Sequence, residues 1–319
     1  MDPLSASENA TPAPGQAPEA AAHRGPQLLS VTRYRMLLET MRPKQWSKNA
    51  FVLAGLVFSG RALEADAELR AWTTFVAFCA ISAASYLVND VRDRHTDKLN
   101  PRTSRRPVAR GDIGPRTALT AAAGLSTLAI GLAVAINLPT AAAVAGYAVL
   151  QIAYSMWLKH EIFIDVMSIA AGFILRAYAG LLCIEAEISP WLLLATGLLA
   201  LFIALAKRRG EVVALAGMSP TQRPVLAFYS VALLDELIAV VTPAIVMVYA
   251  LYGVLGAQSD VMLITLPFVL YGIFRVLFLI HHESAVTEDP SVLAIRDRKL
   301  GICIVLWGIS ASVITVVSV

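Results

Sequence analysis

Three aspartates follow a hydrophobic run at helical spacing. The stretch NDVRDRHTD begins at Asn89 and contains Asp90, Asp93 and Asp97. On a continuous helix, at about 100° per residue, these four side chains fall within one arc of about 100°. Like charges on one helix face repel one another, so this face requires a countercharge.

Two countercharges are open from the sequence. One is the basic segment that follows, NPRTSRRPVARG, which would form structural salt bridges. The other is a hard divalent cation, which takes carboxylate oxygens and shares its remaining ligands with a phosphate-bearing substrate. Because an acidic cluster at the edge of a membrane is costly and usually functional, we favour Mg²⁺ held by Asp90, Asp93 and Asp97.

The composition indicates an integral membrane protein. Of 319 residues, 57% are hydrophobic and 15% are charged, whereas charged residues usually make up about a quarter of a globular domain. Cys79, Cys183 and Cys303 lie in hydrophobic segments without metal-ligand spacing, so we expect buried apolar cysteines and no disulfide framework.

Nine hydrophobic runs predict an all-α integral membrane protein with nine transmembrane helices. The runs lie at about residues 49–60, 72–88, 117–136, 139–158, 162–184, 190–206, 228–256, 261–281 and 300–319. Each is near the length of about 20 residues that crosses a bilayer, except the first, which suffices only if its helix starts near Pro43. Residues 1–30, rich in Ala, Pro and Gly, are expected to form a disordered tail, and residues 31–319 a single catalytic domain.

The basic residues fall mainly on the tail and on alternate connections, while Arg61 and Arg70 fall on the other side. By the positive-inside rule, the N-terminus and the aspartate face lie at the cytoplasmic side of the plasma membrane, and the C-terminus lies outside. Arg176 is too deep to reach the membrane surface cheaply, so it faces the bundle interior. Its partner is either a polar cavity or an acidic residue, with Asp235 and Glu236 as candidates.

The aspartate stretch carries a resemblance. NDVRDRHTD matches the NDxxDxxxD motif of the UbiA superfamily of intramembrane prenyltransferases, and NPRTSRRPVARG resembles the basic segment that follows it there. The similarity extends over about residues 40–319. It implies a nine-helix bundle with an active site at the cytoplasmic face and Mg²⁺ as the cofactor.

The sequence departs from typical members after the sixth run. There a second aspartate-rich motif is expected, but this chain has KRRGE, with Glu211 as its single acid. A basic cluster binds anions directly. Together with RPKQWSKN and YSMWLKHEIFIDV, it resembles the polyprenyl-phosphate phosphoribosyltransferases. That branch implies transfer of 5-phosphoribose from phosphoribosyl pyrophosphate to decaprenyl phosphate, which yields decaprenylphosphoryl-5-phosphoribose for arabinan cell-wall synthesis.

In this chemistry the carboxylates and Asn89 act on the leaving diphosphate through Mg²⁺. The attacking lipid phosphate is already ionised, because its second pKa is near ~6, so it needs no general base. The resemblance also implies a set of substrate-binding residues: Lys44, Lys48, Arg102, Arg105, Arg106, Tyr154, Lys159, Asp165, Lys207 and Arg208. Lys207 and Arg208 are assigned to the 5-phosphate, and attraction of lipid headgroups is the alternative for Lys44 and Lys48.

Two other functions make different predictions for this sequence. An ordinary prenyltransferase of the same fold, with a prenyl diphosphate donor and an aromatic or other small acceptor, predicts a second aspartate cluster. A transporter predicts inverted repeats and charges at the midplane, whereas here the charge lies at one face. The expected partners are the two substrates and membrane lipids, with no nucleic acid, and a homo-oligomer is left open.

Overall fold

The computed structural model describes residues 34–100, 103–214, 224–256, 260–282 and 293–318. The predicted tail, Arg102 and residues 283–292 of the last connection lie outside the described residues. Within these ranges the chain is mainly helical and contains no strand, which confirms the all-α prediction.

The long helices are α3 (Ala65–Arg92), α6 (Pro115–Ile136), α7 (Leu138–Met156), α8 (Ile164–Cys183), α9 (Pro190–Ala214), α10 (Val231–Leu251), α11 (Leu266–His282) and α13 (Arg298–Ser318). The short α-helices are α2 (Ala54–Phe58), α4 (Arg94–Leu99), α5 (Pro107–Arg110) and α12 (Leu293–Arg296). The 3₁₀ helices are η1 (Pro43–Leu53), η2 (Leu158–His160), η3 (Pro224–Phe228) and η5 (Asp260–Thr265), and η4 (Tyr252–Gly256) is a π-helix.

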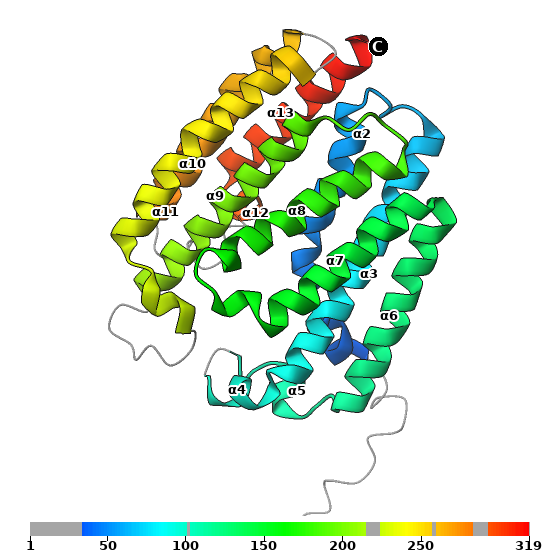
Figure 1. Ribbon diagram of the computed structural model, residues 1–319, viewed down its shortest axis with the longest axis vertical. Helices are drawn as coiled ribbons and strands as arrows, with labels where there is room; N and C mark the ends of the chain where they lie inside the picture. Colours follow the sequence, from blue (N-terminus) through cyan, green and yellow to red (C-terminus); the bar gives the residue numbers. More distant parts are fainter. Residues whose placement is uncertain (1–33, 101–102, 215–223, 257–259, 283–292, 319) are drawn as a thin grey trace, which may run out of the picture.

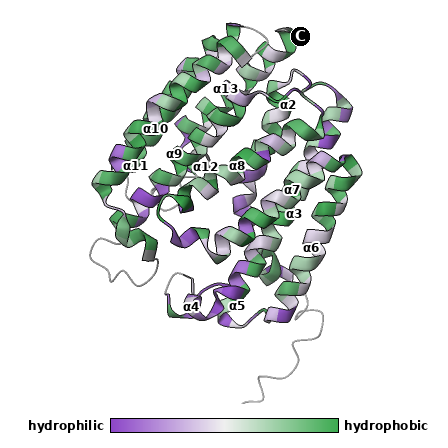
Figure 2. Cartoon of the chain, viewed as in Figure 1, coloured by the Kyte–Doolittle hydropathy of each residue, from purple (hydrophilic) through white to green (hydrophobic). Residues whose placement is uncertain are grey.

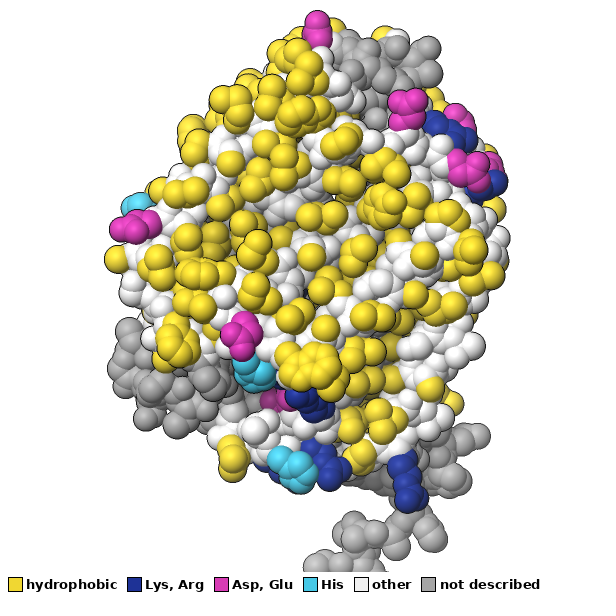
Figure 3. Space-filling view, in the orientation of Figure 1, with side chains coloured by type: hydrophobic (Ala, Val, Ile, Leu, Met, Phe, Trp, Pro, Cys, Tyr) yellow, Lys and Arg dark blue, Asp and Glu magenta, His cyan; other side chains and the backbone are white. Residues whose placement is uncertain are grey.

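Eight helical segments of the described chain are long and apolar enough to cross a membrane, so the chain is a multi-pass membrane protein. They lie side by side in one bundle, with α4 and α5 at one end and the C-terminus at the other (Figure 1). Hydrophilic residues gather at the α4 and α5 end (Figure 2), and hydrophobic side chains cover the middle of the visible face (Figure 3). On this face the bundle therefore has an apolar middle, and the end at α4 and α5, which we call the charged end, is rich in hydrophilic residues.

The segment before α3 has an unusual form. Residues Pro43–Leu53 make a 3₁₀ helix of 11 residues that continues into α2, although 3₁₀ runs longer than three or four residues are uncommon. Its residues repeat with a period of three, so Asn49, Val52 and Gly55 are buried while Lys44 and Ser47 are exposed. The segment runs along α3 and α8 from the charged end to the opposite end (Figure 1).

This segment packs on α8 through two glycines. A Cβ on Gly55 would lie 2.5 Å from the carbonyl oxygen of Gly180, and a Cβ on Gly180 would collide with the carbonyl oxygen of Val52. The two backbones can approach this closely only because neither position has a side chain.

We expect Gly180→Ala to destabilise the protein by about 1–3 kcal/mol, because the added methyl group must push the segment off α8. Gly146→Ala on α7 is the matched control, since nothing lies within 4 Å of its Cβ. Thermal unfolding in detergent measures both variants. Equal midpoints for the two variants would contradict the close packing.

The last helix of the bundle is fixed at its start by Asp297. Asp297 Oδ2 lies 2.6 Å from Arg275 Nη2 of α11, and Asp297 Oδ1 accepts a hydrogen bond of 2.7 Å from the Leu300 amide. The hydrogen bond from Arg275 lowers the pKa of Asp297, and the Leu300 amide adds to this effect. Arg275, which the sequence places within a span, is thus paired.

Acidification should weaken this pair. Because the folded-state pKa lies below the ordinary value of about 3.9, the pair stabilises the fold above that pH and is lost as the pH falls through the folded-state value. In Asp297→Asn the side-chain oxygen can still accept the hydrogen bond from the Leu300 amide at the start of α13, but the charge is removed. The variant should therefore be about 1 kcal/mol less stable at neutral pH. The difference from wild type should disappear in acid, which unfolding curves at several pH values would show.

Candidate active site

The aspartate stretch does not form one continuous helix. Helix α3 ends at Arg92, Asp93 has a non-helical ψ of 4°, and α4 starts at Arg94. The prediction that one helix face carries Asn89 and all three aspartates is therefore wrong. A break at Asp93 relieves the repulsion that a single stacked face would impose, and it turns the carboxylates toward different partners.

Asp90 and Asp97 share one cation. Arg106 Nη1 lies 3.2 Å from Asp90 Oδ1 and 2.8 Å from Asp97 Oδ2. Asp90, which is 1% exposed, also contacts Arg42 Nη2 at 2.5 Å. Arg42 stacks on the Tyr86 ring at 4.8 Å and has a left-handed backbone with φ 53°. A strained backbone outside glycine needs support from its surroundings, and these two contacts supply it.

Asp93 faces a different side of the bundle. Its carboxylate accepts hydrogen bonds from Lys159 Nζ at 3.1 and 3.3 Å, and Lys159 lies in η2 between α7 and α8. The neighbouring Asn89 accepts a hydrogen bond of 2.7 Å from Ser155 of α7. Of the predicted basic segment, Arg106 contacts Asp90 and Asp97, whereas the partner of Asp93 is Lys159 from a different connection.

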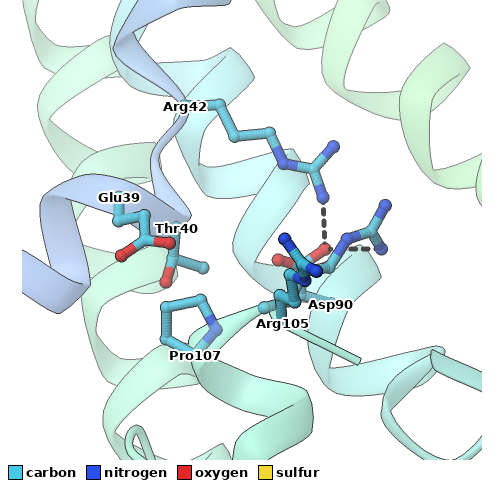
Figure 4. A pocket seen from close by; sticks show the side chains of 7 residues that line it. Glu39, Thr40, Arg42, Asp90, Arg105 and Pro107 are labelled. Atoms are coloured by element: carbon cyan, nitrogen blue, oxygen red, sulfur yellow. Dashed lines mark hydrogen bonds and ion pairs between the residues drawn. The ribbon is translucent and has the colours of Figure 1, made fainter. Parts of the chain in front are cut away.

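A pocket of about 210 Å³ opens beside Asp90 (Figure 4). Arg42, Arg105 and Arg106 line it together with Glu39, Thr40 and Pro107. Arg105 is exposed, and its side chain makes no hydrogen bond or ion pair with the described residues. The pocket therefore presents one uncommitted guanidinium and two that are shared with carboxylates, which suits an anion.

The carboxylates fit a magnesium ion in chemistry and in number. Within the described residues no three acidic, histidine or cysteine side chains lie close enough to hold an ion by themselves. Mg²⁺, however, commonly uses one or two protein carboxylates and completes its shell with substrate phosphates and water. Asp90 and Asp97 already converge on one cation, the half-buried Arg106, whereas Asp93 points to Lys159. The first pair is the better candidate for metal binding.

A second charged cluster lies at the start of α8. Arg208, which is 2% exposed, donates to Asp165 Oδ2 at 2.7 Å and to Glu211 Oε2 at 2.5 Å. Its Nη2 also lies 3.4 Å from the Tyr154 hydroxyl. Tyr154, Asp165 and Arg208, which the sequence names separately, are thus brought together. Because two carboxylates already neutralise Arg208, it is a poor receptor for a 5-phosphate.

Tyr229 also belongs to this cluster, because it contacts the second carboxylate oxygen of Asp165. Its hydroxyl donates to Asp165 Oδ1 at 2.8 Å and accepts from the Phe163 amide at 2.9 Å. Burial and the neighbouring Asp165 raise the pKa of Tyr229 to about 12, so its proton stays in place at neutral pH. Phe163 has φ 65°, so this contact holds a strained turn just before α8.

The remaining predicted residues lie around the two clusters. Lys44 is exposed, and its side chain has no partner among the described residues. Lys48 lies 3.4 Å from the side-chain oxygen of Gln45 on the same segment, and Lys207 is half-buried beside Arg208. Arg102 lies outside the described residues.

Arg176 does not pair with the acids that the sequence offered. Asp235 pairs with Arg209 at 2.6 Å, and Arg176 instead donates to Asn49, Gly172 and Tyr147. The prediction of a seventh-span partner is wrong because α8 turns Arg176 toward η1 and α7. Its ring contacts include Tyr147 at 4.4 Å and Phe173 at 5.2 Å.

The fold and the site define a multi-pass helical membrane protein with clustered carboxylates and arginines at one end of its bundle. The chain matches the UbiA prenyltransferase family over residues 49–295, and it belongs to that family. The predictions of this family and of a membrane-bound transferase are confirmed.

Curated relatives cover most of the chain. The decaprenyl-phosphate phosphoribosyltransferase of Mycolicibacterium smegmatis is 28% identical over 285 residues, which span 85% of this chain and 89% of the relative. The enzyme of the same name from Corynebacterium glutamicum is 36% identical over 225 residues, which span 68% of this chain and 67% of the relative. A UbiA homolog from Archaeoglobus fulgidus, solved with GPP and Mg²⁺, has a TM-score of 0.68 at 19% identity. The match covers 88% of this chain and 99% of that homolog.

Four contributors to these clusters were missed by the sequence reasoning: Arg42, Ser155, Glu211 as an arginine partner, and Tyr229. The sequence did contain a signal for Arg42, because this arginine directly precedes Pro43 at the start of the first hydrophobic segment and therefore lies at the membrane edge. Tyr229 had none, since 64 residues separate it from Asp165.

Proposed function

We propose that this protein transfers 5-phosphoribose from phosphoribosyl pyrophosphate to a polyprenyl phosphate such as decaprenyl phosphate, with release of diphosphate. The observation that carries the proposal is the pairing of Arg208 with Asp165 and Glu211. A buried guanidinium occupies the space between these two carboxylates. A donor that needs two carboxylate-bound metal sites is therefore disfavoured. The names of the relatives favour the same reaction.

In the proposed reaction the bond from ribose C1 to the diphosphate breaks and its electron pair leaves with the diphosphate. A lipid phosphate oxygen forms the new bond to C1, and no proton has to move because that oxygen is already ionised. Arg105 and Arg42 receive phosphoryl groups in the pocket beside Asp90. Lys159, which pairs with Asp93, can bind a second phosphate once Asp93 releases it.

Asp90 and Asp97 are the residues that would hold Mg²⁺, with Asp93 and Asn89 next to them. When bound, Mg²⁺ supplies Lewis-acid stabilisation of the leaving diphosphate, an effect worth several kcal/mol. Arg106 is the side chain that must make way, and its side chain is 28% exposed, compared with 2% for Arg208. This difference favours metal binding at the first cluster.

The test is to incubate the purified protein with labelled phosphoribosyl pyrophosphate, decaprenyl phosphate and Mg²⁺. Label should enter the organic phase in proportion to protein, and EDTA should prevent this. If the folded protein in detergent yields no lipid-linked label, the proposal is rejected.

One observation favours a second candidate. Structural neighbours have been solved with prenyl diphosphates and Mg²⁺, so a prenyl diphosphate donor with an aromatic or other small acceptor is the alternative. The same assay with labelled geranyl diphosphate and 4-hydroxybenzoate decides between them. Transfer in that arm alone would support the alternative.

The topology is part of the proposal. At about 2.0 Å per residue for η1 and about 1.5 Å for α2, the segment Pro43–Phe58 reaches roughly 30 Å, the thickness of the hydrocarbon core. We propose that it makes a ninth crossing, with the N-terminus and the charged end in the cytoplasm and the C-terminus outside the plasma membrane. Alkaline phosphatase fused after residue 319 should then be active, and an inactive fusion would reject this orientation.

A further inference from the structure

Arg176 is a buried charge that contacts no carboxylate in the part of the chain that the structure describes. It is 5% exposed. Five other arginines of the bundle differ, because each has an acidic partner: Arg42, Arg106, Arg208, Arg209 and Arg275. Burying an unpaired charge is costly, so an arginine kept in this state calls for an anion.

The guanidinium also retains hydrogen-bonding capacity. Nε donates to Asn49 Oδ1 at 2.8 Å, Nη1 to the Gly172 carbonyl at 2.9 Å and Nη2 to the Tyr147 hydroxyl at 2.6 Å. Arginine has five N–H groups, so one on Nη1 and one on Nη2 are left without an acceptor in the described chain. Two N–H groups in this fork match the oxygens of a phosphate.

A line of polar side chains leads from the charged end to Arg176. Tyr154, Gln151 and Tyr147 are spaced to share one face of α7, and Asp165, Gly172 and Arg176 share one face of α8. These two helices pack against each other (Figure 1). We call this line the α7–α8 seam. At Gly172 a Cβ would lie 3.5 Å from Arg176 Nη1 and 3.9 Å from the Gln151 amide, so a larger side chain at this position would press on the guanidinium and on the seam.

The depth of Arg176 suits a ligand with two anionic ends. Ser82 belongs to the same hydrogen-bond network through Asn49 and Tyr147. It lies eight residues before Asp90 on α3, or about 12 Å along the helix. An anion at Arg176 and a second one beside Asp90 can therefore be held at the same time.

We propose that Arg176, with Asn49 and Tyr147, binds a phosphate monoester that enters along the α7–α8 seam. This deepens the proposed function and rests on it for the source of the phosphate, which is either the 5-phosphate of the donor or the phosphate of the lipid acceptor. If the phosphate is the 5-phosphate of the donor, Arg176 takes the role that the sequence assigned to Arg208, because Arg208 is already neutralised by two carboxylates.

Binding of two probes without Mg²⁺ tests the proposal. Ribose 5-phosphate represents the donor end and farnesyl monophosphate the lipid, and their affinities are measured by isothermal titration calorimetry in detergent. Arg176→Gln should raise the Kd of one probe at least about tenfold, since hydrogen bonds to a charged group are lost. Arg176→Lys should recover part of the affinity. Arg275→Gln, which removes an arginine paired elsewhere, should bind both probes as wild type does.

The probe whose affinity falls in Arg176→Gln shows whether the site binds the phosphate of the donor or that of the lipid. Should Arg176→Gln not fold, Gly172→Leu keeps the charge but closes the seam, and it should weaken the same probe. Wild-type affinity of a folded Arg176→Gln or Gly172→Leu variant for both probes would overturn the site, as would a wild-type protein that binds neither. If the probes behave as expected but wild-type protein transfers no phosphoribose, the phosphate site stands and the proposed function fails.

Discussion

Asp97→Asn should lower the rate of phosphoribosyl transfer at least about a hundredfold and raise the Mg²⁺ concentration needed for half-maximal rate. The physical reason is that Asp97 and Asp90 are the two carboxylates that converge on one cation. Losing one of two protein ligands removes several kcal/mol of metal stabilisation, and each 1.36 kcal/mol is tenfold in rate. The measurement is initial rate against Mg²⁺ concentration.

The matched control is Asp112→Asn, which removes the same charge from an exposed pair with Arg110 near the same end of the bundle. It should leave both the rate and the Mg²⁺ dependence unchanged. Thermal unfolding of Asp97→Asn should stay close to wild type, since Arg106 keeps its contact with Asp90. A variant with wild-type Mg²⁺ dependence would remove Asp97 from the metal site.

Arg208→Gln should destabilise the protein by about 3–5 kcal/mol, because it leaves the buried carboxylate of Asp165 without its cation. The neighbouring Arg209→Gln is the control. Its partner Asp235 has a 38% exposed side chain, compared with 0% for Asp165, so its loss should cost less than about 1 kcal/mol. Thermal unfolding in the same detergent measures the two variants.

A double variant separates charge from packing. Adding Asp165→Asn to Arg208→Gln removes the unpaired charge, so the pair of substitutions should be less destabilising than the sum of the single effects. Additive losses, or a loss in Arg208→Gln no larger than in Arg209→Gln, would show that the ion pair contributes little.

The sequence was sufficient where a property depends on local pattern. Hydrophobic runs of about 20 residues identify eight of the helices, and the order of charges in NDVRDRHTD identifies the acidic cluster. Arg106 and Lys159 were predicted as site residues from the resemblance, the first in the basic segment that follows that motif and the second in YSMWLKHEIFIDV. Their aspartate partners, however, could be read only from the structure.

The sequence was insufficient where distant segments meet. Arg42 reaches Asp90 across 48 residues and Arg176 reaches Asn49 across 127, and no periodicity encodes such contacts. The break at Asp93 was missed because the helical pattern continues on both sides of it. The 3₁₀ form of η1 was missed because its spacing of three is close to the spacing of an α-helix over a few residues.

The stretched form of η1 has a consequence for how such chains are counted. A search for long apolar helices finds eight crossings in the described part of the chain, and an even number would place both chain ends in one compartment. If Pro43–Phe58 makes the proposed ninth crossing, this thinner and longer element reverses the compartment of the last residue. On that proposal, surveys that assign sidedness from an odd or even number of helices would place the C-terminus of this chain on the wrong side of the membrane, and would do the same for other chains that begin in this extended form.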